Sequence, residues 1–225
     1  MFAVASQVYD FETGILSGAG QIGQFRRGYL RIHDRYFVEP EVEEPDMPYL
    51  TIYATGGSAM YDREKFLAIG GFDTLYSPYG WEDVEVSIRA WRLGYTVHYE
   101  PKSPVWHHFS STIGQKIPKK SVNVIYERNR IMAHWIHLGL NMLLEHIVFL
   151  FINLPRHIIT GKWEYAKAIA ESFKRINYII KMRKAYNGKS VRSIDEIVKK
   201  ILSSKTGSNV QILNAKTAIS KTVHI

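Results

Sequence analysis

Residues 79–100 combine a short amphipathic pattern with a strand pattern, and they constrain the fold more than any other part of the chain. Three apolar side chains recur at spacings of four and three, which predicts a helix over Trp81–Leu93 (Val84, Ile88 and Trp91). Gly94 then suits the position that ends a helix, and residues 95–100 alternate like a strand. A helix that leads directly into a strand favours an α/β domain.

Two adjacent carboxylates, Glu82 and Asp83, fall in the first turn of this predicted helix. The dipole of a helix favours anions at its N-terminus, so we expect Asp83 to be ionised and able to accept a proton. A histidine pair, His107 and His108, follows the strand. The local pattern alone leaves two interpretations open: a catalytic site, or a helix cap with His107 packed in a core.

Five short motifs follow one another along the first half of the chain: Thr55–Met60, Gly70–Asp73, Trp81–Asp83, Arg89–Gly94 and His107–Ser110. Their order resembles the acceptor half of family 2 glycosyltransferases, over about residues 2–130. The resemblance implies an α/β fold with a partial GT-A-like mixed sheet and flanking helices, followed by an amphipathic helical C-terminal region. It also implies inverting transfer of a sugar from a nucleotide-sugar donor to an acceptor hydroxyl.

The same resemblance implies roles for the residues that match the motifs. Asp83, with Glu82 beside it, corresponds to the catalytic general base. Trp81 and the pair Gly56 and Gly57 would shape the acceptor site. The acceptor class implied is a polysaccharide, cell-wall or lipid-linked glycan.

The metal site is where the chain departs from the family pattern. The resemblance implies His107 as a ligand of Mn²⁺ or Mg²⁺ near the diphosphate, whereas the side chain of its strand neighbour His108 should point to the opposite face. The family's donor half carries an Asp-X-Asp motif that binds the metal and the nucleotide, and this sequence has none. We therefore expect an incomplete enzyme, from a truncated gene product, a split enzyme or an expressed fragment, whose donor-binding half a separate chain could supply.

Two other functions fit parts of the sequence. A metal hydrolase would draw on a set of acidic and histidine side chains, but no His-Glu-x-x-His motif is present (Glu82, Asp83, Glu85, His98, His107 and His108). A catalytically inactive glycosyltransferase remnant that binds a membrane or a partner is the stronger alternative, because the donor motif is missing. The basic residues do not form a recognisable nucleic-acid module, so no nucleic acid is expected as a partner.

Charge divides the chain into unequal halves. Residues 1–118 carry 10 Lys/Arg and 15 Asp/Glu, whereas residues 119–225 carry 19 Lys/Arg and 6 Asp/Glu. The asymmetry favours an anionic partner for the second half. We expect residues 1–118 to form the acceptor-side GT-A half, residues 119–186 to form amphipathic helices and residues 187–225 to form a polar tail, in which Ser193 opens a short helix. The absence of cysteine fits a reducing cytoplasm.

Residues 131–154 are mostly apolar and are predicted to form one helix with four polar side chains on a single face (His134, His137, Asn141 and Glu145). A charged group near the centre of a bilayer is costly, so an in-plane helix at an anionic membrane surface is favoured over a span. A core helix docked on the GT-A domain is the other interpretation. Arg128 and Arg130 precede this helix and could contact phosphates or lipid headgroups.

A second amphipathic helix is predicted over residues 162–186, with a basic stripe at Lys167, Lys174 and Lys181. These features predict a cytoplasmic protein that is peripheral on the inner face of the cell membrane. Several smaller elements are also predicted: a strand at Phe2–Phe11, a glycine-rich turn at Gly18–Gly23 that is not a dinucleotide site, an acidic loop at Glu39–Pro48, a strand at Tyr49–Thr55, a helix after Asp62 and a loop over 102–121.

Overall fold

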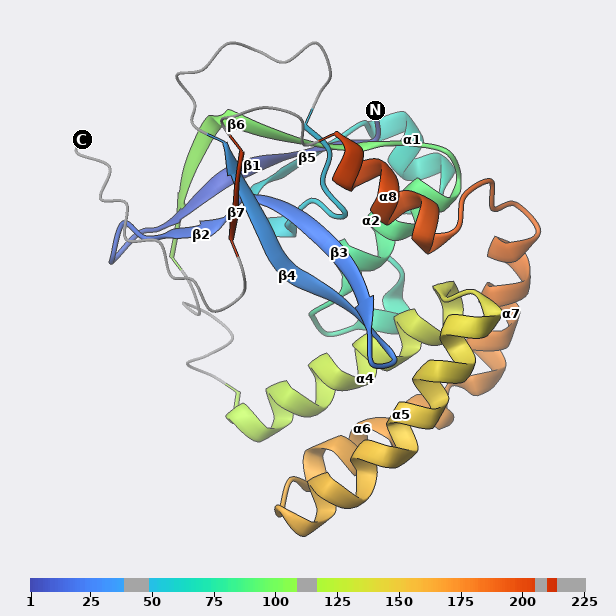
Figure 1. Ribbon diagram of the computed structural model, residues 1–225. Coiled ribbons are helices and arrows are strands. Elements are labelled where there is room, and N and C mark those ends of the chain that lie inside the picture. The colour runs from blue at the N-terminus through green and yellow to red at the C-terminus, as the bar shows by residue number, and fades with distance from the viewer. Residues whose placement is uncertain (39–48, 109–116, 205–209, 214–225) are drawn as a thin grey trace.

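The computed structural model describes residues 1–38, 49–108, 117–204 and 210–213. Its centre is a mixed sheet in which β1 (Ala3–Asp10) pairs antiparallel with β2 (Leu16–Gly18) and β5 (Ala59–Tyr61), and parallel with β6 (Val97–His107). Figure 1 shows this sheet apart from a group of helices formed by the second half of the chain. The predicted α/β class, its mixed sheet and the helical C-terminal region are confirmed.

Strand β6 is longer than the sequence predicted. Its pairing with β1 shifts after Ser6, where the partner changes from Glu100 to Pro104, and then continues to His107. The prediction of a loop is therefore wrong for residues 102–107. A proline lacks a backbone donor, but it is tolerated at a bulge of this kind, where the ladder is interrupted. Residues 109–116 lie outside the described part.

A second, antiparallel sheet contains β3 (Gly20–Arg26), β4 (Tyr29–Val38) and β7 (Val210–Leu213). The glycine-rich turn predicted at Gly18–Gly23 is therefore wrong, because most of it is strand. Gly20 is required by packing: a Cβ there would lie 2.2 Å from the ring of Tyr36. No helix follows β3 directly, which agrees with the rejection of a dinucleotide site.

Residues 49–55 are buried but irregular, so the predicted strand is wrong. The backbone N–H of Ile52 donates to Gln21 in the second sheet, while that of Thr51 donates to Val97 in the first. The segment thus bridges the two sheets, with an isolated bridge from Leu50 to His98 of β6 and no continuous strand of its own. The acidic loop predicted at 39–48 lies outside the described residues.

Two predicted helices of the first half are confirmed. α1 (Arg63–Ala68) is capped by the side chain of Asp62, which accepts a hydrogen bond from the backbone N–H of Lys65 at 3.0 Å. α2 (Glu82–Arg92) lies within the predicted range and ends before Gly94, whose φ of +96° suits a glycine. A short 3₁₀ turn, Gly56–Ser58, lies between the bridging segment and β5.

The helical region contains more breaks than the sequence predicted. The single helix expected over 131–154 is two: α4 (Lys119–His137) and α5 (Leu140–Ile159), separated by the extended residues Leu138 and Gly139. The helix expected over 162–186 is also two, α6 (Trp163–Phe173) and α7 (Ile176–Asn187). The four-residue polar face and the three-lysine stripe are therefore each divided between two helices.

α8 (Ile194–Ser203) begins at the predicted Ser193, whose side chain and that of Glu196 form a reciprocal capping box. Three of its isoleucines are fully buried in the largest core cluster, together with residues of α2 and β1 (Ile194, Ile197 and Ile201). Part of the region predicted as a polar tail therefore packs on the first domain (Figure 1). The three-part division of the chain stays a prediction.

Candidate functional site

Asp83 lies at the start of α2 and contacts the Gly56 turn. Its Oδ2 accepts a hydrogen bond from the backbone N–H of Gly56 at 3.0 Å, and its Oδ1 accepts one from Val84 at 2.8 Å. Burial raises the pKa of Asp83, and the two backbone donors offset this only in part. The helix dipole was expected to hold this group ionised, but desolvation outweighs it. A half-buried carboxylate with a raised pKa is suited to accept a hydrogen bond or a proton.

Glu82 completes the carboxylate pair. Burial raises the pKa of Glu82, and the neighbouring charge of Asp83 raises it further. Among the described residues, its Oε2 atom is buried and has no hydrogen-bond partner. A buried carboxylate oxygen without a partner is unusual in a purely structural position, which supports a site for a hydroxyl-bearing ligand here.

His107 lies on the other side of the same turn. A Cβ built on Gly57 would come 3.1 Å from Nε2 of His107, and one built on Gly56 would come 3.8 Å from Oδ2 of Asp83. Asp83 and His107 therefore approach consecutive residues of one turn, although they are distant in sequence. The approach of His107 is tight enough that glycine suits position 57, whereas the distance at Gly56 is an ordinary van der Waals contact.

His108 points away from this site. Its side chain is exposed, lies 2.9 Å from the carboxylate of Glu12 and stacks on Phe11 with ring centroids 5.2 Å apart. The two histidines thus lie on opposite faces of β6, as the alternation of a strand predicts. Only His107 faces the glycine turn.

Three tyrosines surround Asp83, and sequence reasoning missed them. Burial raises the pKa of Tyr53, Tyr61 and Tyr126, and the charge of Asp83 raises each further. Trp81 is almost fully buried, and its ring packs edge-on against Tyr126 at a centroid distance of 6.0 Å. The aromatic wall therefore involves several elements, and only Trp81 was recognisable from a motif.

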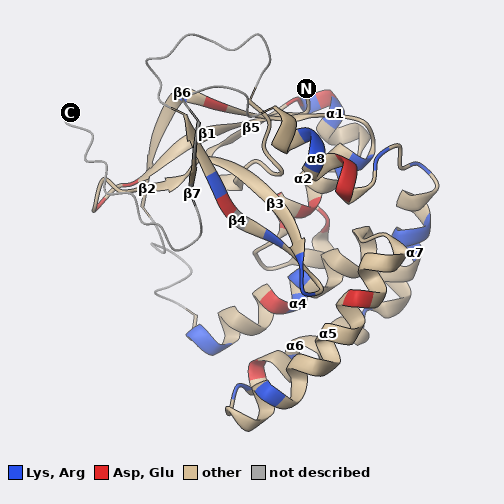
Figure 2. Cartoon of the chain, in the orientation of Figure 1, with Lys and Arg blue, Asp and Glu red and all other residues tan. Residues whose placement is uncertain are grey.

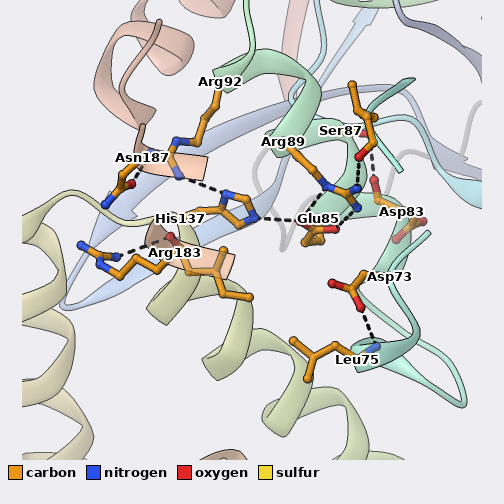
Figure 3. A network of polar contacts seen from close by, with 12 residues as sticks. Asp73, Leu75, Asp83, Glu85, Ser87, Arg89, Arg92, His137, Arg183 and Asn187 are labelled. Atoms are coloured by element: carbon orange, nitrogen blue, oxygen red, sulfur yellow. Dashed lines mark hydrogen bonds and ion pairs between the residues drawn. The ribbon is translucent and has the colours of Figure 1, made fainter. Parts of the chain in front are cut away.

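Glu85, the third carboxylate of α2, belongs to a buried network. Arg89 donates to both of its oxygens at 2.6 and 3.1 Å, and Nε2 of His137 donates to it at 2.9 Å. Figure 3 shows Glu85 between these two partners, with Arg92 on the far side of His137. The hydrogen bond from His137 and the charge of Arg89 overcome the effect of burial and hold the pKa of Glu85 below its ordinary value. Glu85 is thus fully engaged in holding α2 to α4.

The described residues contain no group of three or more His, Asp or Glu side chains that could hold a metal ion. His98 is separate from the site and lies 3.0 Å from the hydroxyl of Thr96. The metal hydrolase interpretation therefore finds no support in the described residues. The divalent metal of the glycosyltransferase interpretation does not fit this part of the chain alone either, because among the described residues Asp83 and His107 at the glycine turn belong to no group of three or more such ligands.

The two arginines predicted to contact phosphate have different surroundings. Arg128 is buried and donates to Oδ1 of Asn129 and to the carbonyl of Ser77, so these hydrogen bonds engage its guanidinium within the fold, and its role as a phosphate contact stays a prediction. Asn129 in turn donates to the backbone carbonyls of the loop before α2 (Tyr76, Tyr79 and Gly80). Arg128 and Asn129 thus hold the loop that positions Trp81. Arg130 lies with its guanidinium 4.5 Å from the ring centroid of Tyr29, at the edge of a cleft described below.

Comparisons with known proteins cover the stretch that contains these residues. Residues 38–110, which contain the glycine turn, α2 and His107, match a family model described as the N-terminal domain of galactosyltransferase. The chain is 24% identical to human polypeptide N-acetylgalactosaminyltransferase 10 over 167 residues, which covers 72% of this chain and 26% of that enzyme. It is 39% identical over 54 residues to probable N-acetylgalactosaminyltransferase 9 of Caenorhabditis elegans, covering 24% of this chain and 9% of the relative.

The fold is also similar to a solved structure, that of GalNAc-T7 with UDP, GalNAc and Mn²⁺. The TM-score is 0.56 at 16% sequence identity, and the match covers 92% of this chain and 36% of that one. Together the comparisons relate the chain to glycosyltransferases of the GT-A fold, and within these to the polypeptide N-acetylgalactosaminyltransferases. The chain spans about a quarter of the length of the human and mouse enzymes that it matches.

This relationship bears on one expectation. The polypeptide N-acetylgalactosaminyltransferases retain the configuration of the transferred sugar, whereas the sequence motifs were taken to imply inversion. A general base that deprotonates the attacking hydroxyl belongs to the inverting course. The stereochemistry and the general-base role of Asp83 therefore have no support from the comparisons.

Proposed function

We propose that this chain provides the acceptor side of a glycosyltransferase that moves a sugar from a nucleotide-sugar donor to a glycan. The observation that carries the proposal is the glycine turn at 56–57, against which Asp83 and His107 both lie. The turn and both side chains fall inside the stretch that matches the galactosyltransferase family model. Two residues that are distant in sequence and approach one turn in the folded chain, inside a matched stretch, support a shared site.

In this proposal the carboxylates hold the sugar. Asp83 accepts a hydrogen bond from a sugar hydroxyl, since its oxygens already face the turn and burial strengthens such a bond. Glu82 offers its unpartnered oxygen to a second hydroxyl. Tyr53, Tyr61 and Tyr126 exclude water from the site.

The donor side is proposed to come from outside this chain. The structural neighbour was solved with UDP and Mn²⁺, and this chain covers 36% of it. The described residues hold no metal group, so we expect titration of UDP-GalNAc with Mn²⁺ into the isolated chain to show no micromolar binding. Micromolar binding would mean that the chain contains its own donor site.

The acceptor side is tested by sugar binding. A panel of monosaccharides and short glycans is screened by saturation-transfer NMR, and the strongest ligand is titrated into the wild type and Asp83→Asn. We expect at least about tenfold weaker binding by the variant, because a buried acceptor of hydrogen bonds is lost. Asp195→Asn, an exposed aspartate on α8, is the matched control and should bind like the wild type. Equal binding by all three proteins would contradict the assignment.

A second candidate is an inactive remnant that binds a membrane or a partner, and α5 favours it. Among the described residues, α5 is the one helix long and apolar enough to cross a membrane, and little of it is buried. However, Glu145 and His146 bind the β3–β4 turn, so one face of α5 is docked on the protein. We therefore propose that α5 lies in the plane of the inner face of the cell membrane, with its apolar face in the interface. This localisation applies to an active enzyme as well as to a remnant.

A further inference from the structure

A large cleft lies between the tip of the β3–β4 hairpin and the helices α4, α5 and α6. Its volume is about 1050 Å³, and Trp81 forms part of its wall. Its lining contains five cationic side chains from four separate segments (Arg27, Arg31, Arg130, Arg156 and Lys162). The lining includes two carboxylates, Glu127 and Glu164, of which Glu127 is already paired with Arg130. The cleft therefore carries an excess of positive charge. Figure 2 shows Lys and Arg positions in blue at the tip of the β3–β4 hairpin.

The hairpin tip is held in a conformation that places an arginine at the cleft. Arg27 has a φ of +50° and Gly28 a φ of +74°, in the two-residue turn between the paired residues Arg26 and Tyr29. Such turns favour asparagine or glycine, and an arginine with positive φ is strained. A strained residue that persists at a ligand-sized cavity suggests a function for its side chain.

Helix α5 holds this turn in place through two hydrogen bonds. The carboxylate of Glu145 accepts a hydrogen bond from the N–H of Gly28 at 2.9 Å, and Nδ1 of His146 donates to the carbonyl of Gly28 at 2.6 Å. Both polar groups of one glycine are thus bound by adjacent residues of a mostly apolar helix. The position of Arg27 relative to Arg156, on the same helix α5, is therefore set by specific hydrogen bonds.

Aromatic rings line the cleft between its charged side chains. The guanidinium of Arg130 lies over the ring of Tyr29, whose hydroxyl is hydrogen-bonded to that of Tyr165. His157 stacks on Tyr165 with ring centroids 4.3 Å apart. Burial lowers the pKa of His157, and the charges of Lys162, Arg156 and Arg130 lower it further, while Glu127 opposes them. The charges of Lys162, Arg156 and Arg130 are thus all close enough to His157 to lower its pKa.

We propose that this cleft binds a phosphate or diphosphate group of the acceptor, so that the acceptor is a phosphate-bearing glycan or lipid. This inference rests on the proposed function and specifies its substrate class. Guanidinium groups match phosphate because their N–H donors form paired hydrogen bonds. Trp81 connects the cleft with the carboxylate pair that follows it in α2. A sugar attached to a phosphate in the cleft would extend toward Asp83.

The test uses pyrophosphate as the probe, titrated calorimetrically into the whole chain. Arg27→Gln combined with Arg156→Gln removes two exposed charges from the cleft, and we expect the Kd to rise at least about tenfold. Lys167→Gln combined with Lys181→Gln removes two exposed charges elsewhere and should leave the Kd within about twofold of the wild type. If the first double variant does not fold, Arg31→Gln replaces it, with a smaller rise expected.

Vesicles distinguish the source of the phosphate. Phosphatidylcholine vesicles with and without phosphatidic acid are sedimented with each protein. If the Arg27/Arg156 variant loses phosphatidic-acid-dependent sedimentation and the lysine control does not, the phosphate belongs to a lipid headgroup. If the Arg27/Arg156 variant binds pyrophosphate more weakly but sediments like the wild type, the phosphate belongs to a soluble phosphorylated glycan.

Two results would overturn the proposal: no pyrophosphate binding at millimolar concentration, or equal weakening in the lysine control. Neither depends on Asp83→Asn, because pyrophosphate carries no sugar. The failure of this inference can therefore be told from the failure of the proposed function.

Discussion

Helices α2 and α5 reverse the usual relation between composition and burial. α2 contains three acidic and two basic residues, yet most of its side chains are buried. α5 is the most apolar helix among the described residues, yet only His146 and Leu150 are buried in it. Burial in this protein follows the available partners and not the hydrophobicity of the segment.

The reason lies in what each helix packs against. α2 lies in the main core, where Glu85, Arg89 and His137 satisfy one another, so that charge inside the protein is tolerated. α5 docks on the β3–β4 turn through two polar residues and leaves large apolar side chains outside (Leu144, Val148, Phe151 and Ile152). An exposed apolar face of this kind marks an interaction surface. α2 thus has its packing partners within this chain, whereas the exposed apolar face of α5 has none among the described residues.

The largest effect is expected from a substitution in the buried network of α2. Glu85→Ala leaves Arg89 buried without a counter-charge, and we expect the free energy of unfolding to fall by about 3–5 kcal/mol. Urea denaturation measures this. Glu171→Ala is the matched control, because Glu171 also pairs with two cations but at the surface of α6, and it should cost less than about 1 kcal/mol. Equal losses would mean that the buried network does not hold α2.

Low pH should destabilise the fold through its buried histidines. Burial lowers the pKa of His134 and His137, and it lowers the pKa of His146 to about 4. A folded-state pKa below the unfolded value gives stability that is complete above about pH 6.5 and is lost as the pH falls toward the folded-state pKa. His146 alone should contribute about 3 kcal/mol to this loss. Asp83 and Glu82, whose pKa values are raised, act in the opposite direction.

The measurement is the urea midpoint at pH 7 and at pH 4.5. In His146→Gln the difference between the two pH values should shrink, because the titrating ring is gone. His108→Gln, at the exposed residue directly after β6, is the control and should keep the wild-type difference. An unchanged difference in His146→Gln would show that the buried histidine does not titrate with unfolding.

A smaller effect tests the exposed helix. Phe151→Gln combined with Ile152→Gln should weaken binding to anionic vesicles by at least about tenfold, since each side chain contributes roughly 1.5–3 kcal/mol of burial if inserted fully and tenfold needs only about 1.4 kcal/mol in all. Added salt should weaken the wild type further without abolishing its binding, because screening acts only on the basic residues. Leu67→Gln, an exposed apolar residue on α1, should have no effect. A wild type that does not sediment with vesicles at low salt would refute the membrane proposal.

Much of the first half could be predicted from local signals. The helical spacing of apolar residues, the capping residues and the glycines at helix ends located α1, α2 and the start of β6. The alternation of side chains along a strand predicted that His107 and His108 point to opposite faces. These features depend on residues a few positions apart. The match of His107 with the Gly57 turn required the family resemblance, because the two residues are joined only by tertiary packing.

The remainder depends on long-range partners that a single sequence does not reveal. Gly139 breaks the long apolar helix, but a lone glycine is often tolerated within one. The roles of Arg128 and Asn129 depend on loop carbonyls about fifty residues earlier. Glu145, on the predicted polar face, is a docking group, because the hairpin turn supplies its hydrogen-bond donor. The same reasoning explains why the basic cleft was not foreseen: its residues come from separate segments.

The central claim is that Asp83 and the glycine turn hold a sugar. A crystal structure of the chain soaked with the strongest ligand of the sugar panel tests it directly. We predict a sugar hydroxyl within about 2.7 Å of an Asp83 carboxylate oxygen, with Gly56–Gly57 and His107 beside the ring. A sugar bound elsewhere, with Asp83 still contacting only backbone N–H groups, would contradict the account.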